Sequence, residues 1–203
     1  MLKRSRIGIM GGTFDPIHNG HLLMAEYSRI QFNLDKVLFI PTGIPPHKEH
    51  NKILPNRYRY DMVLLAINSN ENFFLSTMEM DREKTTYTID TINILKSMYK
   101  DVDFYFIMGS DSFLQIHKWK NYKELLGMCN FIVAKRPGYN NSNINSLIEN
   151  LSSTCNSSIF TLDASLLEIS SSEIRSRISK NLPISYLVPE SVEKYIYKNK
   201  LYR

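Results

Sequence analysis

Short apolar runs alternate along the chain with longer segments in which apolar residues recur every three or four positions. A short apolar run is typical of a buried strand, whereas the longer spacing is typical of a helix with one buried face. Strands are predicted at residues 7–10, 36–40, 73–75, 103–108, 131–134 and 159–162. Because parallel strands need a crossover between them, the alternation predicts an α/β fold with a doubly wound parallel sheet and helices on both faces.

Helices are predicted between these strands and after the last one, at residues 20–32, 57–68, 89–99, 122–129, within 140–158, from 171 onward and around 192–196. Ser170 and Glu173 fit a capping box, which marks a helix start. Residues 140–158 are rich in Asn and Ser, but their apolar positions keep helical spacing, so we interpret them as an exposed helix. With 203 residues, 43% of them hydrophobic, the chain is predicted to form a single domain, residues 1–203.

A glycine-rich connection, residues 11–20, follows the first predicted strand. Gly11 and Gly12 allow a ligand to approach the backbone, and the next helix start offers unpaired N–H groups and a positive dipole end. His18 and His21 would lie on one side of that helix, where both rings can donate to phosphate oxygens. A glycine pair alone is also typical of a tight turn, and a histidine pair can arise by chance. The combination predicts a phosphate site that matches neither the Gly-Lys-Ser/Thr pattern nor the GxGxxG fingerprint.

Other candidate positions lie where further strands and helices meet. The hydroxyl residues before residue 89 are helix caps in the simplest interpretation, but the same helix start can bind a carboxylate. Asp111, after the fourth predicted strand, is either a helix cap or a ligand of a ribose or base. Ser171, Ser172 and Arg175 can form an anion clamp at a helix start. Trp119, the only tryptophan, is either a core anchor or a stacking surface for a flat aromatic ligand.

Composition narrows the class of protein. The net charge of +5 and the isoelectric point of about 9.1 favour anionic ligands in general. The basic residues are spread along the chain, so no nucleic acid partner is predicted. Cys129 and Cys155 form no paired motif and are expected to be reduced thiols of a cytoplasmic protein. No signal-peptide core and no apolar run near the ~20 residues that span a bilayer are present, so no membrane partner is predicted.

The two phosphate motifs together resemble those of the nucleotidyltransferase superfamily that carries a His-x-Gly-His motif. Here the motif is His18-Asn19-Gly20-His21, and a Ser-Ser…Ile-Arg motif follows at residues 171–175, near the other end of the chain. Over its whole length the chain is similar to the bacterial nicotinate-nucleotide adenylyltransferase family. The resemblance implies a Rossmann-like fold and an enzyme of NAD biosynthesis. It would transfer AMP from ATP to nicotinate mononucleotide and give deamido-NAD and pyrophosphate.

The resemblance also implies roles for individual residues. The catalytic residues of this chain would be His18, His21 and Arg175. The residues that bind ATP would be Gly11, Gly12, Thr13, Phe14, His18, His21, Gly109, Asp111, Ser171, Ser172 and Arg175. The residues that bind the acceptor nucleotide would be His47, Lys48, Thr86, Tyr87, Trp119 and Arg136. Within this last group, His47 and Lys48 would bind the acceptor phosphate. Backbone of Thr86 and Tyr87 would bind the acid group, and Trp119 would stack on the nicotinate ring.

The implied reaction suits these residue types. The attacking phosphate oxygen is anionic at neutral pH, so the site needs no general base and no covalent nucleophile. It must hold two anions in line and stabilise charge on the leaving pyrophosphate, which histidines, helix amides and an arginine can do. Mg²⁺ is expected to arrive with ATP, and no metal site on the protein is predicted, because the sequence has no carboxylate cluster. The expected partners are ATP and nicotinate mononucleotide, and a homo-oligomer is compatible with the sequence.

Alternative functions remain open at this point. An adenylyltransferase for nicotinamide mononucleotide would differ from one for nicotinate mononucleotide only in binding an amide instead of an acid group on the ring. Phosphopantetheine adenylyltransferase shares the fold and the phosphate motifs, but its chains are shorter and lack the features at Thr86, Tyr87 and Trp119. A nucleotide sensor or an RNA-binding module is the non-enzyme alternative. The intact His18 and His21 argue against a sensor, and the scattered charge argues against RNA.

Overall fold

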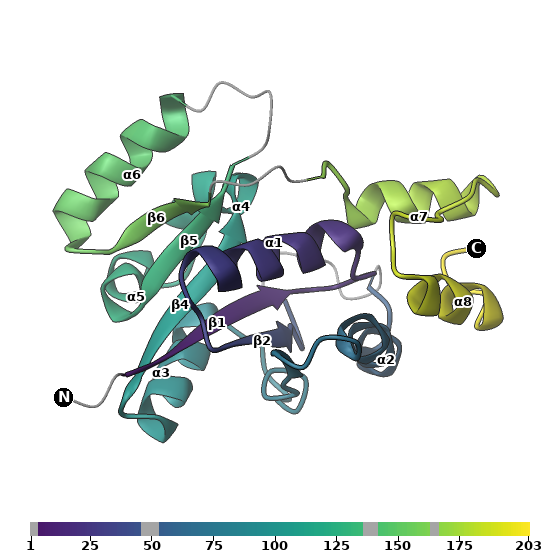
Figure 1. Ribbon diagram of the computed structural model, residues 1–203, viewed down its shortest axis with the longest axis horizontal. Helices are drawn as coiled ribbons and strands as arrows, with labels where there is room; N and C mark the ends of the chain where they lie inside the picture. Colours follow the sequence, from purple (N-terminus) through teal and green to yellow (C-terminus); the bar gives the residue numbers. More distant parts are fainter. Residues whose placement is uncertain (1–3, 46–52, 136–141, 163–166) are drawn as a thin grey trace.

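Figure 1 shows the computed structural model of the chain, which describes residues 4–45, 53–135, 142–162 and 167–203. These residues form a sheet of six parallel strands in the order β3-β2-β1-β4-β5-β6. The strands are β1 (Ser5–Gly12), β2 (Lys36–Pro41), β3 (Phe73–Leu75), β4 (Val102–Gly109), β5 (Asn130–Ala134) and β6 (Ile159–Leu162). The strand order confirms the predicted α/β, Rossmann-like, doubly wound sheet.

The helices lie between the strands and after the last one. They are α1 (Asn19–Gln31), α2 (Asn56–Ile67), α3 (Thr88–Met98), α4 (Ser110–Leu114), the 3-10 helix η2 (Ile116–Lys118), α5 (Tyr122–Met128), α6 (Ser142–Cys155), α7 (Ser171–Ser179) and α8 (Glu190–Lys198). The longer ones match the predicted segments to within a few residues, whereas α4 and η2 were not predicted. Both are only about one turn long, so they bury too few residues to give a periodic pattern.

The sheet separates two apolar clusters. Met10 of β1 and Ile107 of β4 pack on one face with residues of α1, α2, α7 and α8. Ile9 and Phe106, one residue earlier on the same strands, pack on the other face with residues of α3, α4, α5 and α6. Successive strand residues point to opposite faces, so a strand with helices on both sides has apolar residues at every position. This arrangement confirms the prediction of helices on both faces.

The end of β1 differs from the prediction. Gly11 and Gly12 were predicted to lie in the connection to the first helix, but they are the last two residues of the strand. They pair with Ile40 and Pro41 of β2, so the hydrogen-bonded ladder continues through both glycines. The connection therefore consists of residues 13–18, and it begins at the carboxyl edge of the sheet.

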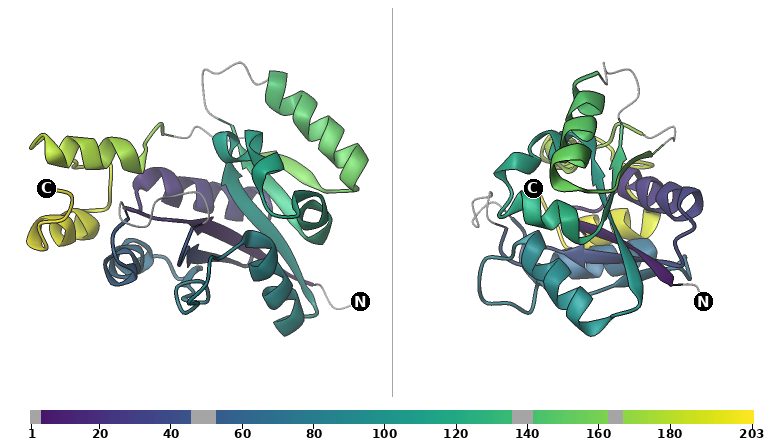
Figure 2. Two further views of the ribbon diagram at one scale, coloured as in Figure 1. Left: turned by 180° about the vertical axis from the view of Figure 1, so that it is seen from behind. Right: turned by 90° about the vertical axis from the view of Figure 1, so that its left-hand side faces the viewer.

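The C-terminal helices pack at this same edge. The left-hand view of Figure 2 shows that α7 and α8 lie at the end of the molecule toward which β1 runs, opposite the start of that strand. The hydroxyl of Tyr195 on α8 donates to Oδ2 of Asp61 on α2 at 2.6 Å. The N–H of Asn19, the first residue of α1, donates to the carbonyl of Leu187 at 2.9 Å. The C-terminal part of the chain thus contacts the segment that follows β1.

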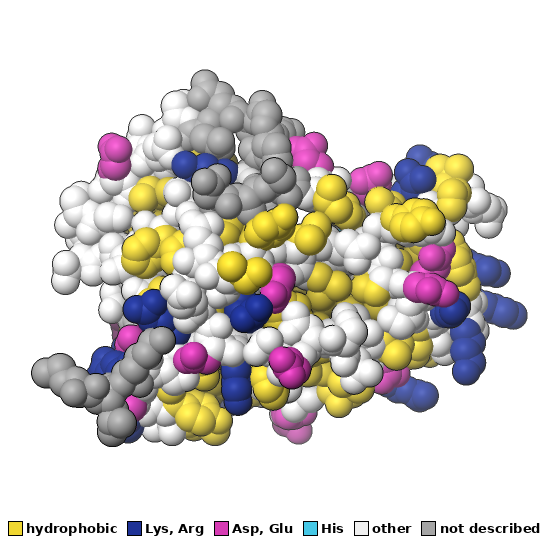
Figure 3. Space-filling model, in the orientation of Figure 1, with side chains coloured by type: hydrophobic (Ala, Val, Ile, Leu, Met, Phe, Trp, Pro, Cys, Tyr) yellow, Lys and Arg dark blue, Asp and Glu magenta, His cyan; other side chains and the backbone are white. Residues whose placement is uncertain are grey.

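One group of basic side chains lies over the C-terminal helices. On the face shown in Figure 3, Lys and Arg side chains gather over the C-terminal helices and are scattered elsewhere. The exposed basic residues of this C-terminal part include Lys180, Lys194, Lys198, Lys200 and Arg203. None of the helices in the described part of the chain has the length and apolar character needed to cross a membrane.

Candidate active site

A cavity of about 850 Å³ lies at the carboxyl ends of the central strands. It is located at the junction of β1 and β4, from which the chain winds outward in opposite directions across the sheet. Ligands of open parallel sheets bind at such a switch point. The first turns of α1, α3, α4 and α7 all contribute lining residues, so four helix N-termini surround one cavity of a size typical for small ligands.

His18 and His21 lie against each other at the start of α1. Their rings are stacked, with centroids 3.6 Å apart and an interplanar angle of 24°, and both residues line the cavity. The N–H of His18 donates to Nδ1 of His21 at 3.2 Å, so a neutral His21 carries its proton on Nε2. Gly20 leaves room for the stack, because a β-carbon there would lie 3.1 Å from Nδ1 of His18.

Burial keeps His18 uncharged at neutral pH. The residue is 6% exposed, and burial lowers its pKa from 6.5 to about 4. Its Nδ1 has no hydrogen-bond partner among the described residues. Without a ligand, the His18 ring is therefore a neutral imidazole, which can donate one hydrogen bond but adds no full positive charge.

The start of α7 is joined to the loop of residues 13–18. The hydroxyl of Ser171 donates to the carbonyl of Pro16 at 2.8 Å, and Nη1 of Arg175 donates to the carbonyl of Asp15 at 2.6 Å. The hydroxyl of Ser170 accepts from the N–H of Glu173 at 3.2 Å, as the predicted helix start requires. Ser170, Ser171 and Ser172 line the cavity, whereas Arg175 is not among the lining residues, and its guanidinium contacts the loop backbone.

Two of the residues predicted to bind ATP, Gly109 and Asp111, lie at the end of β4 and the start of α4. Gly109 is the N-cap of α4, and Asp111 lies in the first turn of this helix, so Asp111 is not the cap itself. Both residues line the cavity. Met10, Met24 and Met108 line the same region and had not been predicted; their side chains offer a polarizable apolar surface for a flat base.

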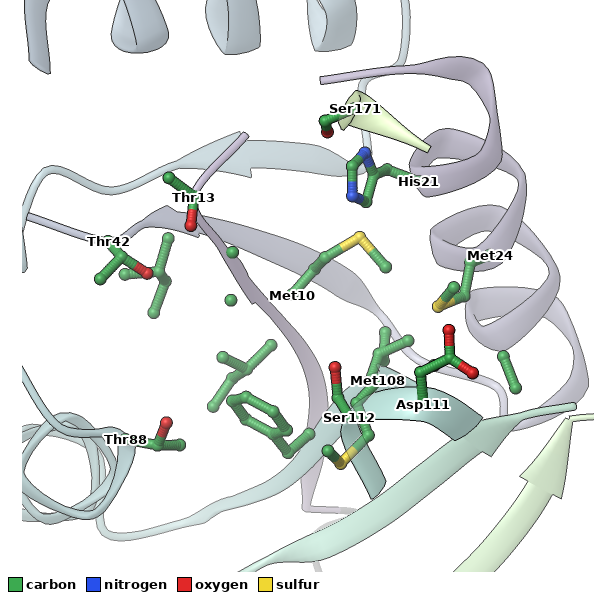
Figure 4. A pocket seen from close by; sticks show the side chains of 18 of the residues that line it. Met10, Thr13, His21, Met24, Thr42, Thr88, Met108, Asp111, Ser112 and Ser171 are labelled. Carbon is green, nitrogen blue, oxygen red and sulfur yellow. The ribbon is translucent and has the colours of Figure 1, made fainter. Parts of the chain in front are cut away.

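Figure 4 shows how the lining side chains are distributed. Asp111 and Met24 lie on one side of the cavity and Thr42 and Thr88 on the other, and the ring of His21 lies beside Ser171 at the upper edge of the view. A ligand with two ends could therefore contact both groups.

The start of α3 differs in detail from the predicted acid-binding element. The N–H of Thr86 donates to the carbonyl of Ile44 at 3.0 Å, so it is already paired. The N–H groups of Tyr87 and Thr88 have no partner within the described residues, and these two residues line the cavity. Trp119 also lines the cavity, and its ring packs at 90° against that of Phe106, with centroids 5.8 Å apart. The unpaired donors thus lie one residue further along the chain than predicted.

Two charged residues near this helix start had not been predicted. Nζ of Lys120 lies 4.6 Å from the ring centroid of Tyr87 and 3.2 Å from Oδ2 of Asp90. Glu79 is buried, and its Oε1 accepts from the hydroxyl of Thr91 at 2.7 Å; burial raises the pKa of Glu79. The sequence could have indicated Lys120 as a site residue, because it is adjacent to Trp119. Glu79 lies in a polar segment that carries no motif, so the sequence alone did not indicate it.

The remaining predicted residues have different positions. Thr13 lines the cavity, whereas the ring of Phe14 is buried in the core and does not. That ring packs edge-on against the ring of His21, with centroids 5.1 Å apart, so it restricts the movement of the histidine. His47, Lys48 and Arg136 lie outside the described residues, as do the segments around them. Within the described ranges, no group of three or more His, Cys, Asp or Glu side chains could hold a metal ion.

Comparison with known proteins identifies the class. The model of the Cytidylyltransferase-like family matches residues 9–177, which include both histidines and the start of α7. Together with the switch-point cavity, this match shows that the chain is a nucleotidyltransferase of the Cytidylyltransferase-like family.

Relatives with full-length similarity narrow the family further. A probable nicotinate-nucleotide adenylyltransferase of Thermoanaerobacter sp. (strain X514) is 48% identical over 204 residues, which cover 100% of this chain and 97% of that protein. Another, of Moorella thermoacetica, is 46% identical and covers 99% and 93%. The chain belongs to the nicotinate-nucleotide adenylyltransferase family, which is a family of enzymes. The Plasmodium falciparum nicotinic acid mononucleotide adenylyltransferase complexed with NaAD has the same fold, with a TM-score of 0.82, 23% identity and 98% and 97% coverage.

Proposed function

We propose that this chain transfers the adenylyl group of ATP to the 5′-phosphate of nicotinate mononucleotide and releases deamido-NAD and pyrophosphate. The observation that carries the proposal is the stacked pair His18 and His21 in a cavity that the starts of α1, α3 and α7 also line. Donors at α1 and α7 suit a triphosphate, and donors at α3 suit a second anionic group. The names of the relatives point to the same reaction.

The bond changes need no proton transfer. An oxygen of the acceptor phosphate forms a bond to the α-phosphorus of ATP, and the bond from this phosphorus to the bridging oxygen breaks, so the electron pair leaves with pyrophosphate. The attacking oxygen is already anionic at neutral pH. The chain's contribution is to align the two phosphates and to donate hydrogen bonds to oxygens that gain charge.

The donors for this task are an imidazole and backbone groups. His21 donates through Nε2–H, because its Nδ1 accepts from the N–H of His18. The N–H groups of Ser171 and Ser172, in the first turn of α7, have no partner within the described part of the chain. Arg175 adds positive charge one turn into α7. Mg²⁺ would arrive with ATP and neutralise part of the triphosphate charge, with phosphate and water as its ligands.

The start of α3 supports the acid form of the acceptor. A carboxylate gains from the unpaired N–H groups of Tyr87 and Thr88, from the helix dipole and from the ammonium of Lys120, although Asp90 offsets part of that charge. A carboxamide lacks the charge and turns its NH₂ group toward donors. Poorly paired buried donors cost roughly 1–3 kcal/mol each, so two of them give discrimination on the order of 10²-fold.

The test is pyrophosphate release from ATP with nicotinate mononucleotide, nicotinamide mononucleotide and phosphopantetheine as separate acceptors. We expect kcat/KM for the nicotinate nucleotide to exceed that for the nicotinamide nucleotide on the order of 10²-fold, and no turnover of phosphopantetheine. Equal values for the two pyridine nucleotides would overturn the acid specificity but not adenylyl transfer. No turnover with any acceptor would overturn the proposed function.

A further inference from the structure

A largely buried polar cluster includes one residue of the loop of residues 13–18 and two residues that pack around this loop. It consists of Asp15, Arg59 and Tyr202, and none of the three lines the cavity. Asp15 is 3% exposed and Arg59 is 1% exposed. Burying charged groups is costly unless they are paired and hydrogen-bonded, so a cluster of this kind needs partners that hold it in place.

The contacts of the cluster involve two segments, the loop of residues 13–18 and the segment that follows β2. The hydroxyl of Tyr202 donates to Oδ1 of Asp15 at 2.7 Å, and burial and the charge of Asp15 raise the pKa of Tyr202, so that it remains a donor. Nη1 of Arg59 donates to the carbonyl of Thr13 at 2.8 Å, and Nη2 donates to the carbonyl of Gly43 at 3.3 Å. Arg59 thus connects the start of the His18 loop with the segment that follows β2.

The charges of the cluster compensate one another. Burial lowers the pKa of Arg59, and the nearby charge of Asp15 opposes this effect. Further acceptors around the guanidinium are the carbonyl of Leu54 at 3.0 Å and Oδ1 of Asn56. Removing one member would leave another buried group without its partner, which is the costly case.

We propose that Asp15, Arg59 and Tyr202 are positioning residues for adenylyl transfer, because they hold the loop of residues 13–18 in the shape that stacks His18 on His21. This inference rests on the proposed function. The cavity side of the loop must keep its donors available for phosphate, so the loop has to be held by contacts elsewhere. Misplacing a group beside the reacting atoms by about 1 Å can cost on the order of 10²-fold in rate, which makes a rigid support important.

The chain offers a matched pair of variants. Tyr202→Phe removes the hydroxyl that donates to Asp15, and Tyr195→Phe removes a hydroxyl that donates to Asp61 at 2.6 Å. Both changes delete one tyrosine–carboxylate hydrogen bond in the C-terminal part of the chain. Of the two hydroxyls, only that of Tyr202 is hydrogen-bonded to the loop of residues 13–18, so the comparison separates positioning from general stability.

Two readouts are measured for each variant. The first is kcat at saturating ATP and nicotinate mononucleotide. The second is the NMR titration of the His18 imidazole without substrate, which reports whether water reaches the ring. We expect Tyr202→Phe to lower kcat about tenfold and to shift the pKa of His18 from about 4 toward 6.5, because a loosened loop exposes the ring. Tyr195→Phe should leave kcat within twofold and the titration unchanged.

The proposal is overturned if Tyr202→Phe leaves the His18 titration as in the wild type, or if Tyr195→Phe changes it as much. If Tyr202→Phe does not fold, Asp15→Asn keeps an acceptor for Tyr202 but removes the charge facing Arg59, and the same two readouts decide by the same criteria. The titration is recorded without substrate, so it still decides the positioning role if the wild type fails to transfer an adenylyl group.

Discussion

Replacing Gly20 by alanine should impair catalysis while leaving the fold intact. A β-carbon at this position would lie 3.1 Å from Nδ1 and 3.2 Å from Cε1 of His18, and 3.5 Å from the carbonyl oxygen of Leu167. The ring of His21, 3.6 Å away, limits the room into which His18 can move. The His18 ring must therefore slide or tilt by a few tenths of an ångström, and the stack changes its geometry.

The expected magnitude follows from two opposing effects. Alanine is favoured over glycine in a helix by about 0.5–1 kcal/mol, which offsets the strain of the shifted ring, so thermal unfolding should change by only about 2 °C. A small displacement of a group beside the reacting phosphate raises the barrier by about 1.4 kcal/mol, which lowers kcat about tenfold.

The assay is steady-state pyrophosphate release at saturating substrates, together with thermal unfolding of the same samples. Gly127→Ala in α5 is the matched control, because the nearest atom to its new β-carbon is the carbonyl oxygen of Cys155 at 3.7 Å, an ordinary contact. A wild-type kcat for Gly20→Ala, or an equal loss in Gly127→Ala, would refute the reasoning.

His21→Ala should lower kcat on the order of 10²-fold with intact folding, because it removes a transition-state donor; a near-normal kcat would exclude that role. His18 binds a proton below pH 6.5 in the unfolded chain but only below about pH 4 in the folded chain. The free energy of unfolding should therefore decrease by about 2–3 kcal/mol when the pH falls from 7 to 4.5. Urea unfolding of His18→Gln should no longer show this decrease in the free energy of unfolding. The same decrease as in the wild type would contradict the explanation that burial lowers the pKa of His18. Arg175→Ala should raise KM for ATP far more than KM for the acceptor, and the reverse pattern would mean that the two subsites are misassigned. Trp119→Ala should raise KM for the nicotinate and nicotinamide nucleotides by a similar factor, because stacking does not read the acid group, whereas a change in one alone would contradict that role.

The inner strands β2, β4 and β5 could be predicted because they are largely buried on both faces and therefore form apolar runs. Runs such as residues 103–108 carry this information in adjacent positions. The end of β1 could not be predicted in the same way. Gly11 and Gly12 have the local preference of a turn, and their strand conformation depends on pairing with Ile40 and Pro41.

The parts of the site that depend on residues close in sequence could be predicted. The parts that depend on contacts between distant residues could not. The spacing of His18 and His21 fixes their shared face, and the structure stacks them. The pairing of Thr86 with Ile44 and that of Tyr202 with Asp15 join residues 42 and 187 positions apart. No periodicity or motif links such positions, so these contacts emerge only when the fold brings the segments together.

The most direct test of the account uses ATP labelled at the α-phosphorus, with nicotinate mononucleotide as acceptor and His21→Ala as the comparison. Adenylyl transfer predicts that the label appears in deamido-NAD, that the released pyrophosphate carries none, and that His21→Ala incorporates label on the order of 10²-fold more slowly. Label in the pyrophosphate, or no label in a dinucleotide product of the wild type, would contradict adenylyl transfer at this site.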